Sequence, residues 1–245
     1  MKKILYLVCC SLLFINYSLA DTQFEERKFI LFFKLPIVPK ISIMQISTNL
    51  SIINNNKYEL NFKVKTLNLV DYISKINGEG FVNGSIKNGN YFPASYKYDY
   101  VRKSKKKSVS LKYLDGKISE DKFTPPFDKN KLTPIDDEQK HNTVDPATLF
   151  LRLLELDKTN QCNEIINVYD GKRRYDIIFN EKKIDSNVIE CSAWQSKIGG
   201  YKTDKIDPLT NTDIVKIRYT NSTNNGFLEL NAKKGLIELS IIEIH

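Results

Sequence analysis

The sequence is poor in the residues on which most catalytic and metal sites depend. Its 245 residues include only 2 His and 4 Cys, too few for a Cys/His-rich metal protein. It has no Gly-rich phosphate loop, no His-Glu-x-x-His motif and no Asp-x-Asp-x-Asp-Gly loop. His141 lies in a polar stretch and His245 ends the chain, so neither marks a nucleophile–base pair. We therefore expect a non-enzymatic protein with no catalytic residues, no metal and no cofactor.

Long apolar runs are also absent, with one exception at the N-terminus. Lys2 and Lys3 precede the apolar run Ile4–Ile15, which at about twelve residues is shorter than the ~20 that a membrane-spanning helix needs. Small residues then follow in Ser18-Leu19-Ala20, where a signal peptidase would cleave. We expect residues 1–20 to be a signal peptide and residues 21–245 to form a single exported domain. An uncleaved N-terminal anchor is the alternative.

Cleavage would remove Cys9 and Cys10 and leave Cys162 and Cys191. An even pair of cysteines in an exported protein indicates a disulfide. Closing this loop of about thirty residues would stabilise the fold by roughly 3–4 kcal/mol. A redox or metal role is disfavoured, because the sequence has no Cys-x-x-Cys and no histidine near either thiol.

The positive charge is weak evidence for a polyanionic partner. The formal charge is +8, but 31 of the 37 basic residues are Lys and only 6 are Arg. Nucleic-acid binding usually shows clustered Arg with interleaved aromatics, so we expect no nucleic acid. The one dense basic run is Arg102-Lys103-Ser104-Lys105-Lys106-Lys107. We interpret it as a solvated hairpin loop, with an anion-binding patch as the alternative.

Most of the chain alternates between apolar and polar residues with a period of two, which indicates half-buried antiparallel strands. The clearest segment has Tyr58, Leu60, Phe62 and Val64 on one face. The alternation recurs in segments 96–100, 111–113, 215–219, 227–231 and 236–244. Pairs that suit turns with positive φ separate the segments: Asn77-Gly78, Asn83-Gly84, Asn88-Gly89, Asp115-Gly116, Asp170-Gly171 and Asn225-Gly226. We predict roughly ten strands in an antiparallel meander.

One segment breaks the alternation and predicts a helix from about Asp145 to Asp157. Asp145 suits the N-cap, Pro146 suits the first helical position, and Val144 can pack against Leu149 as a hydrophobic staple. The polar residues form one narrow stripe: Thr148, Arg152 and Glu155. Apolar residues cover the rest, as in a helix surrounded by protein, so we place it on the concave face of a curved sheet. Residues 124–142 are predicted to be a long surface loop.

The densest cluster of charged and aromatic residues follows Cys162. Asp170-Gly171 suits a turn, after which Arg173 shares a face with the inward-pointing Tyr175, while Arg174 points the other way. Arginine holds carboxylates and phosphates through two parallel hydrogen bonds. Asp170, Arg173, Arg174 and Tyr175 are therefore candidates for a ligand site or a structural ion pair, and we favour the ion pair.

Several landmarks together resemble domain of unknown function 3108, a family of exported proteins of Gram-negative bacteria. They are the signal peptide, Val144-Asp145-Pro146 with the Leu-rich helix, Cys162, the segment 168–176, Cys191 and Gly200-Tyr201. The resemblance implies a periplasmic location. It implies no activity and no catalytic residues, because none is established for the family.

We expect a mainly β fold: a strongly curved antiparallel sheet or incomplete β-barrel, with one apolar helix on its concave face. This architecture looks like that of periplasmic lipid and lipoprotein carriers, although a fold does not dictate a function. The leading hypothesis is a non-enzymatic binding or cell-envelope-maintenance protein that holds an apolar or amphipathic, lipid-like ligand and is at most peripheral to the membrane. The alternatives are an adaptor that pairs with an envelope protein through an exposed strand edge, and a hydrolase that uses strand carboxylates.

Overall fold

The computed structural model describes residues 22–154, 162–185, 188–202, 214–220, 227–234 and 236–244. The predicted signal peptide and the Asn225-Gly226 pair therefore lie outside the described residues. The strands are β1 Thr22–Leu35, β2 Val38–Ile53, β3 Lys57–Thr66, β4 Ile76–Lys87, β5 Asn90–Arg102, β6 Lys105–Leu114, β7 Lys117–Thr124, β8 Ile165–Tyr169, β9 Arg174–Asp185, β10 Val188–Gly199, β11 Ile214–Thr220, β12 Phe227–Lys234 and β13 Ile237–Ile244. The helices are α2 Asn68–Ser74 and α3 Pro146–Leu154, with short 3-10 turns η2 Lys129–Lys131 and η3 Glu138–Lys140.

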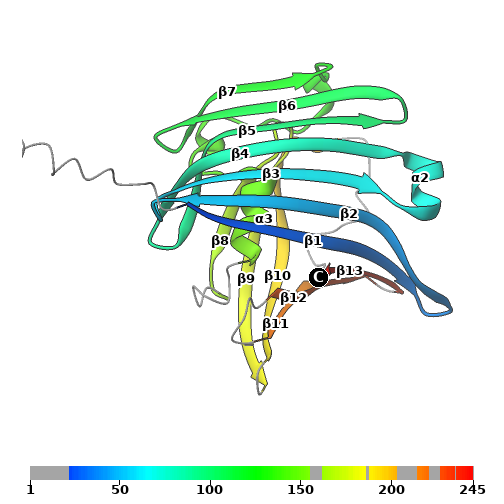
Figure 1. The fold of residues 1–245 in the computed structure, drawn as a ribbon. Helices are drawn as coiled ribbons and strands as arrows, with labels where there is room; N and C mark the ends of the chain where they lie inside the picture. The colour runs from blue at the N-terminus through cyan, green and yellow to red at the C-terminus, as the bar shows by residue number, and fades with distance from the viewer. Residues whose placement is uncertain are drawn as a thin grey trace, which may run out of the picture.

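All of these strands belong to one antiparallel sheet. Its order is β7-β6-β5-β4-β3-β2-β1-β13-β12-β11-β10-β9-β8, so the two halves of the chain join through the pairing of β1 with β13. The sheet is strongly curved, and β8–β10 cross the direction of β1–β7 steeply (Figure 1). It stays open, with β7 and β8 as its edges. The predicted meander and incomplete barrel are confirmed, but the described strands number thirteen rather than about ten.

The segment between β7 and α3 bridges the open side of the sheet. Near its end, the amide of Asn142 donates to the carbonyl of Gly116 at 2.7 Å, and the amide of Val144 donates to the carbonyl of Asn167 in β8 at 2.8 Å. The hydroxyl of Tyr169 also reaches across, donating to Oδ2 of Asp121 in β7 at 2.8 Å. The predicted surface loop therefore links the two edges, which limits the backbone that they expose.

Only some of the predicted turns are turns. Asn88-Gly89 and Asp115-Gly116 have positive φ at both residues and connect β4 to β5 and β6 to β7, as predicted. The prediction was wrong for Asn77-Gly78 and Asn83-Gly84, which lie within β4.

The glycines of β4 leave room for aromatic rings of the neighbouring strand. A Cβ atom at Gly80 would lie 2.2 Å from Cζ of Phe62, and one at Gly84 would lie 2.7 Å from Cε1 of Tyr58. A side chain at Gly80 would therefore displace the ring of Phe62, because interiors are close-packed. One at Gly84 would also collide with the backbone carbonyl oxygen of Phe92 on β5, 2.0 Å from the Cβ position.

Helix α3 lies inside the curve of the sheet and starts as predicted (Figure 1). Oδ1 of Asp145 accepts hydrogen bonds from the amides of Ala147 and Thr148, both at 2.9 Å, which is N-cap geometry. The described part ends at Leu154, so the predicted end at Asp157 lies outside it. Two residues of the polar stripe are enclosed, and the third, Glu155, lies outside the described residues. Thr148 is fully buried, and Arg152 donates to the carbonyl of Tyr91 from Nε at 3.1 Å and Nη2 at 2.9 Å.

The helix joins two apolar clusters. Leu154 packs with residues of β8–β11 and β1, including Phe29 and Val168, whereas Leu151 packs with residues of β2–β6, including Leu60. Because α3 contributes to both clusters, it ties the two halves of the sheet into one core.

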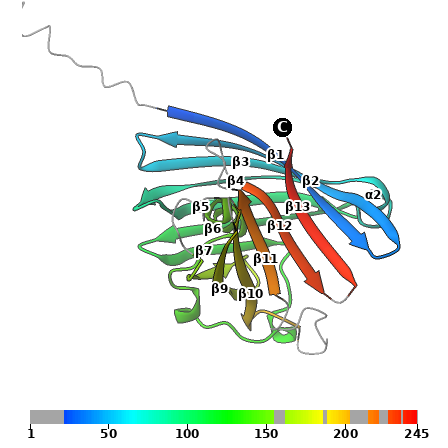
Figure 2. The same cartoon turned by 90° about the horizontal axis from the view of Figure 1, so that it is seen from below.

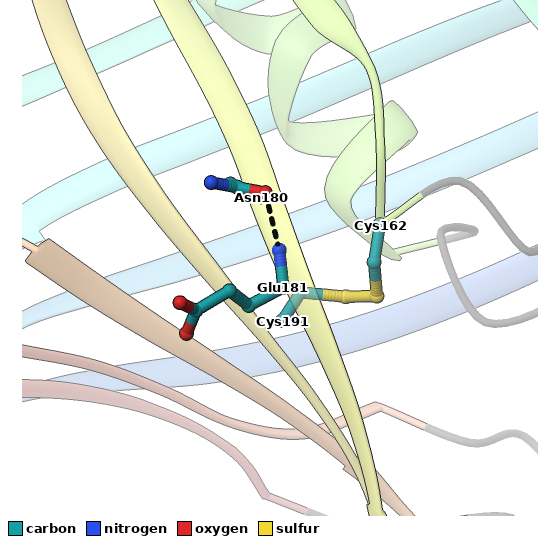
Figure 3. Close-up of a disulfide and its surroundings, with 4 residues drawn as sticks. All are labelled: Cys162, Asn180, Glu181 and Cys191. Carbon is teal, nitrogen blue, oxygen red and sulfur yellow. Dashed lines mark hydrogen bonds between the residues drawn. A yellow bond between two sulfur atoms is a disulfide. The ribbon is translucent and has the colours of Figure 1, made fainter.

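A disulfide joins Cys162, between α3 and β8, to Cys191 in β10, with the Cα atoms 5.4 Å apart (Figure 3). Both cysteines are buried. On β9, the pairing with β10 shifts opposite Cys191 and Ser192. Glu181 is the extra residue of this β-bulge, and its amide donates to Oδ1 of Asn180 at 2.9 Å. The predicted disulfide is therefore present, beside an irregular point of the β9–β10 pair.

Candidate functional site

Three tyrosines of β5 line the concave face in succession. Tyr96, Tyr98 and Tyr100 alternate along the strand, and the rings of Tyr98 and Tyr100 stack with their centroids 4.9 Å apart. The ring of Phe62 on β3 lies 5.5 Å from that of Tyr98. A Cβ atom at Gly78, on the strand between them, would lie 2.9 Å from Cε2 of Tyr98. The missing side chains of β4 thus make the space in which this aromatic row lies.

The aromatic row forms one wall of a pocket of about 780 Å³. Residues from the concave face of β5–β7, the turn between β8 and β9, and the end of β10 line it. They are Tyr96, Tyr98, Tyr100, Arg102, Lys107, Val109, Phe123, Pro146, Asp170, Lys172, Arg173, Lys197, Gly200, Tyr201 and Lys202. Six of these side chains carry a positive charge and one a negative charge, so the described lining is strongly cationic.

The turn between β8 and β9 is built around the carboxylate of Asp170. Its Oδ1 accepts from the amides of Lys172 at 2.9 Å and Arg173 at 2.6 Å, and its Oδ2 accepts from Nε of Arg173 at 2.8 Å. Gly171 has a φ of +86°, and a Cβ atom there would lie 2.6 Å from Cγ1 of Val109 on β6. The turn therefore folds on its own hydrogen bonds and packs directly against the opposite half of the sheet.

Gly200 allows the end of β10 to approach this turn. Its φ is +80°, and a Cβ atom would lie 2.0 Å from the carbonyl oxygen of Lys172. The next residue, Tyr201, receives a hydrogen bond on its hydroxyl from Nε2 of Gln195 at 2.9 Å. The ammonium of Lys197 lies 5.5 Å from the centre of the Tyr201 ring, within the range of a cation–π contact.

The cations of the pocket repel one another. Burial lowers the pKa of Lys172, and the charges of Arg173, Lys202 and Lys107 lower it further, while Asp170 opposes them. Such crowding of like charges is relieved when an anion binds among them.

The hydroxyls of Tyr98 and Tyr100 remain neutral donors at ordinary pH. Burial raises the pKa of Tyr98 to about 12, with a further contribution from Tyr100. Burial also raises the pKa of Tyr100, against the opposing effect of Arg102. A protonated hydroxyl donates one hydrogen bond and also presents an apolar ring face. The pocket therefore combines positive charge, hydrogen-bond donors and aromatic surface.

The structure separates the candidate residues of the segment 168–176. Asp170 and Arg173 form an ion pair and both line the pocket. Arg174 is buried elsewhere: its Nε donates to the carbonyl of Gln139 at 2.6 Å, and its Nη1 pairs with Asp176. Tyr175 packs against the apolar cluster that contains the disulfide. Arg174 and Tyr175 therefore have structural partners, whereas Arg173 combines a structural ion pair with a place in the pocket wall.

The basic run forms the hairpin between β5 and β6, and its two ends reach the pocket. Lys103 and Ser104 form the hairpin turn with positive φ, as the hairpin interpretation predicted. Arg102 and Lys107, at the two ends of the run, line the pocket. Sequence reasoning missed Lys197 and Lys202, because no motif marks them and only the fold brings them to Arg173.

A buried polar network lies beneath the pocket, where Pro146 forms part of the lining. The hydroxyl of Thr148 donates to Oδ2 of Asp145 at 2.7 Å. The hydroxyl of Tyr58 lies 3.0 Å from Oγ1 of Thr148. Because the hydroxyl proton of Thr148 already points at Asp145, Tyr58 is the donor in this second hydrogen bond and Thr148 the acceptor. Burial raises the pKa of Asp145 to about 6, against the opposing hydrogen bonds from Thr148 and Ala147. This network anchors α3 to β3.

The charged groups of the pocket can hold an anionic group. The described lining offers cationic donors and ring faces around a single carboxylate, and Arg173 already occupies that carboxylate. Within the described ranges, no group of three or more His, Cys, Asp or Glu side chains is placed to hold a metal ion.

The fold and the pocket define an incomplete β-barrel whose concave face holds helix α3 and a cationic pocket. The sequence pattern of the family described as "Protein of unknown function (DUF3108)" matches residues 33–224, and the chain belongs to this family. No curated protein sequence matches it. Among solved structures, the crystal structure of a beta-barrel-like protein of domain of unknown function DUF1849 from Brucella abortus is similar. The identity is 10%, the TM-score is 0.46, and the match covers 89% of this chain and 95% of that chain.

Proposed function

We propose that this protein is an exported, non-enzymatic binding protein of the periplasm, and that it holds an anionic amphipathic ligand in the pocket between β5 and the β8–β9 turn. The observation that carries the proposal is the lining, in which six cations and one carboxylate surround a row of tyrosines. The N-terminal sequence and the disulfide support export, because disulfides persist in oxidising compartments.

The chemistry of the lining favours a phosphate or carboxylate group joined to an apolar or ring-shaped portion. Arg173 uses Nε on Asp170, which leaves the other guanidinium donors to face a ligand. Lys172, Lys197 and Lys202 supply further charge, while the rings of Tyr98 and Tyr100 supply apolar surface. A pocket that mixes apolar walls with a few convergent polar groups is typical of small-molecule sites.

The core limits how such a ligand can be held. Leu151 and Leu154 of α3 fill the concave face between the two halves of the sheet. An acyl chain therefore has less room there than in an empty barrel, and we place the charged end of the ligand in the cationic pocket. This favours recognition of an anionic headgroup over enclosure of a wholly apolar molecule.

The adaptor alternative has less support, because features of the structure protect both sheet edges. Val144 pairs with Val168 and covers part of β8. The other edge, β7, carries Lys117, Glu120 and Lys122 within eight residues, and charged side chains on an edge strand discourage pairing with another chain.

Isothermal titration with dodecyl phosphate, an anionic amphiphile, tests the proposal, with the neutral dodecyl maltoside as the comparison. We expect dodecyl phosphate to bind and the double variant Lys197→Ser/Lys202→Ser to weaken that binding at least fivefold, which corresponds to about 1 kcal/mol. The matched control is Lys57→Ser/Lys117→Ser, because both lysines are exposed at the opposite end of the sheet. Equal binding of the two amphiphiles, or equal affinity of the Lys197/Lys202 variant, would contradict the proposal.

A further inference from the structure

Three neighbouring connections at one end of the sheet expose large apolar side chains. The turn between β1 and β2 exposes Ile37 by 94%, α2 between β3 and β4 exposes Tyr72 by 91% and Ile73 by 71%, and the turn between β12 and β13 exposes Leu236 by 73%. We call these four residues the apolar rim. Soluble proteins expose single apolar residues commonly, but several at adjacent tips indicate an interaction site.

The strand register places the apolar rim at a single end of the sheet. Leu35 pairs with Val38 beside Ile37, and Lys34 of β1 pairs with Glu238 of β13 next to Leu236. The amide of Leu67, just before α2, donates to the carbonyl of Ile43 in β2 at 2.9 Å. The three connections therefore join six strands that are consecutive in the sheet, β4-β3-β2-β1-β13-β12. Figure 2 shows α2 and the two hairpin tips on the same side of the molecule.

The basic turn between β5 and β6 continues this end of the sheet. Its backbone is tied to the end of α2, because the amide of Lys103 donates to the carbonyl of Lys75 at 3.1 Å. Lys103, Lys105 and Lys106 are exposed and have no ion-pair partner among the described residues. The apolar rim is thus flanked by a cluster of uncompensated positive charge.

The opposite end of the same strands has turns of a different kind. The β2–β3, β4–β5 and β6–β7 turns consist of the polar or small residues Asn54, Asn55, Asn56, Asn88, Gly89, Asp115 and Gly116. The apolar residues exposed near this end are Phe24 at 75%, Leu114 at 65% and Phe92 at 43%, and they belong to strands rather than to the turns themselves. The two ends of the sheet therefore differ: one has polar turns, and the other has apolar tips next to a basic turn.

We propose that the apolar rim and the basic β5–β6 turn dock this protein on a membrane surface that contains anionic phospholipid. Single apolar side chains at the tips of separate turns can enter the headgroup layer, where Tyr72 also suits the interface. The lysines contact lipid phosphates, because an anionic surface attracts basic side chains that lie close to it. A lipid surface fits better than a folded protein partner, because the tips protrude separately and basic side chains adjoin them.

The docking surface adjoins the cationic pocket through one residue. Nε of Arg102 donates to Oγ of Ser74 in α2 at 3.4 Å, and the same arginine lines the pocket. Docking would therefore bring the pocket beside the lipid headgroups. The inference stands on surface residues outside the pocket lining, so it can fail or succeed independently of the proposed function.

Vesicle co-sedimentation tests the docking surface, with the chain from Asp21 onward at low and high salt. Vesicles of phosphatidylcholine with 30 mol% phosphatidylglycerol should bind the protein, and pure phosphatidylcholine should bind it far more weakly. We expect Lys103→Ser/Lys105→Ser/Lys106→Ser to reduce the partition coefficient by about a hundredfold, and Ile37→Ser/Ile73→Ser to reduce it by about tenfold. High salt should weaken binding of the wild type through screening.

Matched controls at the opposite end of the sheet separate docking from general charge and hydrophobicity. Leu114→Ser removes an apolar side chain of similar exposure to Ile73, and Lys57→Ser/Lys87→Ser/Lys117→Ser removes three lysines near the polar turns. Both should bind anionic vesicles as the wild type does. All variants should keep the wild-type urea midpoint and dodecyl phosphate affinity, which shows that fold and pocket are intact.

Three outcomes would overturn the inference. They are wild-type binding by both rim and lysine variants, equal binding to neutral and anionic vesicles, and reduction of binding by the control variants to the same degree. Sedimentation velocity without vesicles provides a further test: a dimer that Ile37→Ser/Ile73→Ser abolishes would show that the rim binds a second copy of the chain instead.

Discussion

The stability of this protein should fall as the pH rises through about 6, because of one buried carboxyl group. Asp145 is completely buried beneath the pocket, and burial raises its pKa to about 6. In the unfolded chain the pKa of an aspartate is about 3.9. The folded state therefore binds this proton more tightly than the unfolded state does. Its contribution to stability is fully present below the unfolded pKa and is lost as the pH rises through the folded pKa.

The size of the effect follows from the difference between the two pKa values. About two pH units, at roughly 1.4 kcal/mol per unit, give a total of about 3 kcal/mol. Of this total, about 2 kcal/mol is lost between pH 4.5 and pH 8, because the group is already partly ionised in the unfolded chain at pH 4.5. That loss is a large fraction of the stability of an ordinary domain.

Urea unfolding of the wild type and Asp145→Asn, followed by circular dichroism from pH 4.5 to pH 8, measures the effect. Asparagine is as good an N-cap as aspartate and does not titrate, so the difference between the two free energies of unfolding isolates the Asp145 carboxyl. Thr148→Val should move the midpoint of the pH dependence upward, because the Thr148 hydroxyl bond lowers the pKa of Asp145. A difference that stays constant with pH would refute the reasoning.

Two further predictions concern the core. Replacing both cysteines, Cys162→Ala/Cys191→Ala, should lower the free energy of unfolding by about 3–4 kcal/mol, because the disulfide closes a loop across 29 positions; urea unfolding measures this, and an unchanged midpoint would contradict it. Gly80→Ala should cost about 1–3 kcal/mol through overpacking, since its Cβ would lie 2.2 Å from Cζ of Phe62. The double variant Gly80→Ala/Phe62→Leu should recover part of this loss, and failure to recover any would show that the clash lies elsewhere.

The predictable features of this fold have local causes. Asn88-Gly89 and Asp115-Gly116 form turns because both residues tolerate positive φ. Asp145 starts a helix because its own side chain accepts the amides two and three residues later. The alternation that defines the strands likewise depends only on the residue and its neighbours in sequence.

The role of the β4 glycines could not be predicted from the local sequence. The local sequence of Asn77-Gly78 and Asn83-Gly84 predicts turns, but both pairs lie within strand β4. Glycine is required at 78 and 84 because a side chain there would collide with neighbouring strands. A Cβ atom at Gly78 would collide with Tyr98, Asp99 and Tyr100 of β5. A Cβ atom at Gly84 would collide with the backbone of Phe92 on β5 and the ring of Tyr58 on β3. A steric requirement imposed by another strand leaves no local signature.

The sequence by itself thus determined many of the strands, some of the turns, the start of the helix and the pairing of the two cysteines. Only the tertiary structure decided which arginine belongs to the pocket: Arg174 is neutralised by Asp176 in the interior, while Arg173 joins Lys107 and Lys197 from distant strands. The physical reason is the distance along the chain over which each interaction acts. Backbone preference and side-chain period act over a few residues, whereas a charged pocket or an exposed rim exists only once a curved sheet has brought separate strands together.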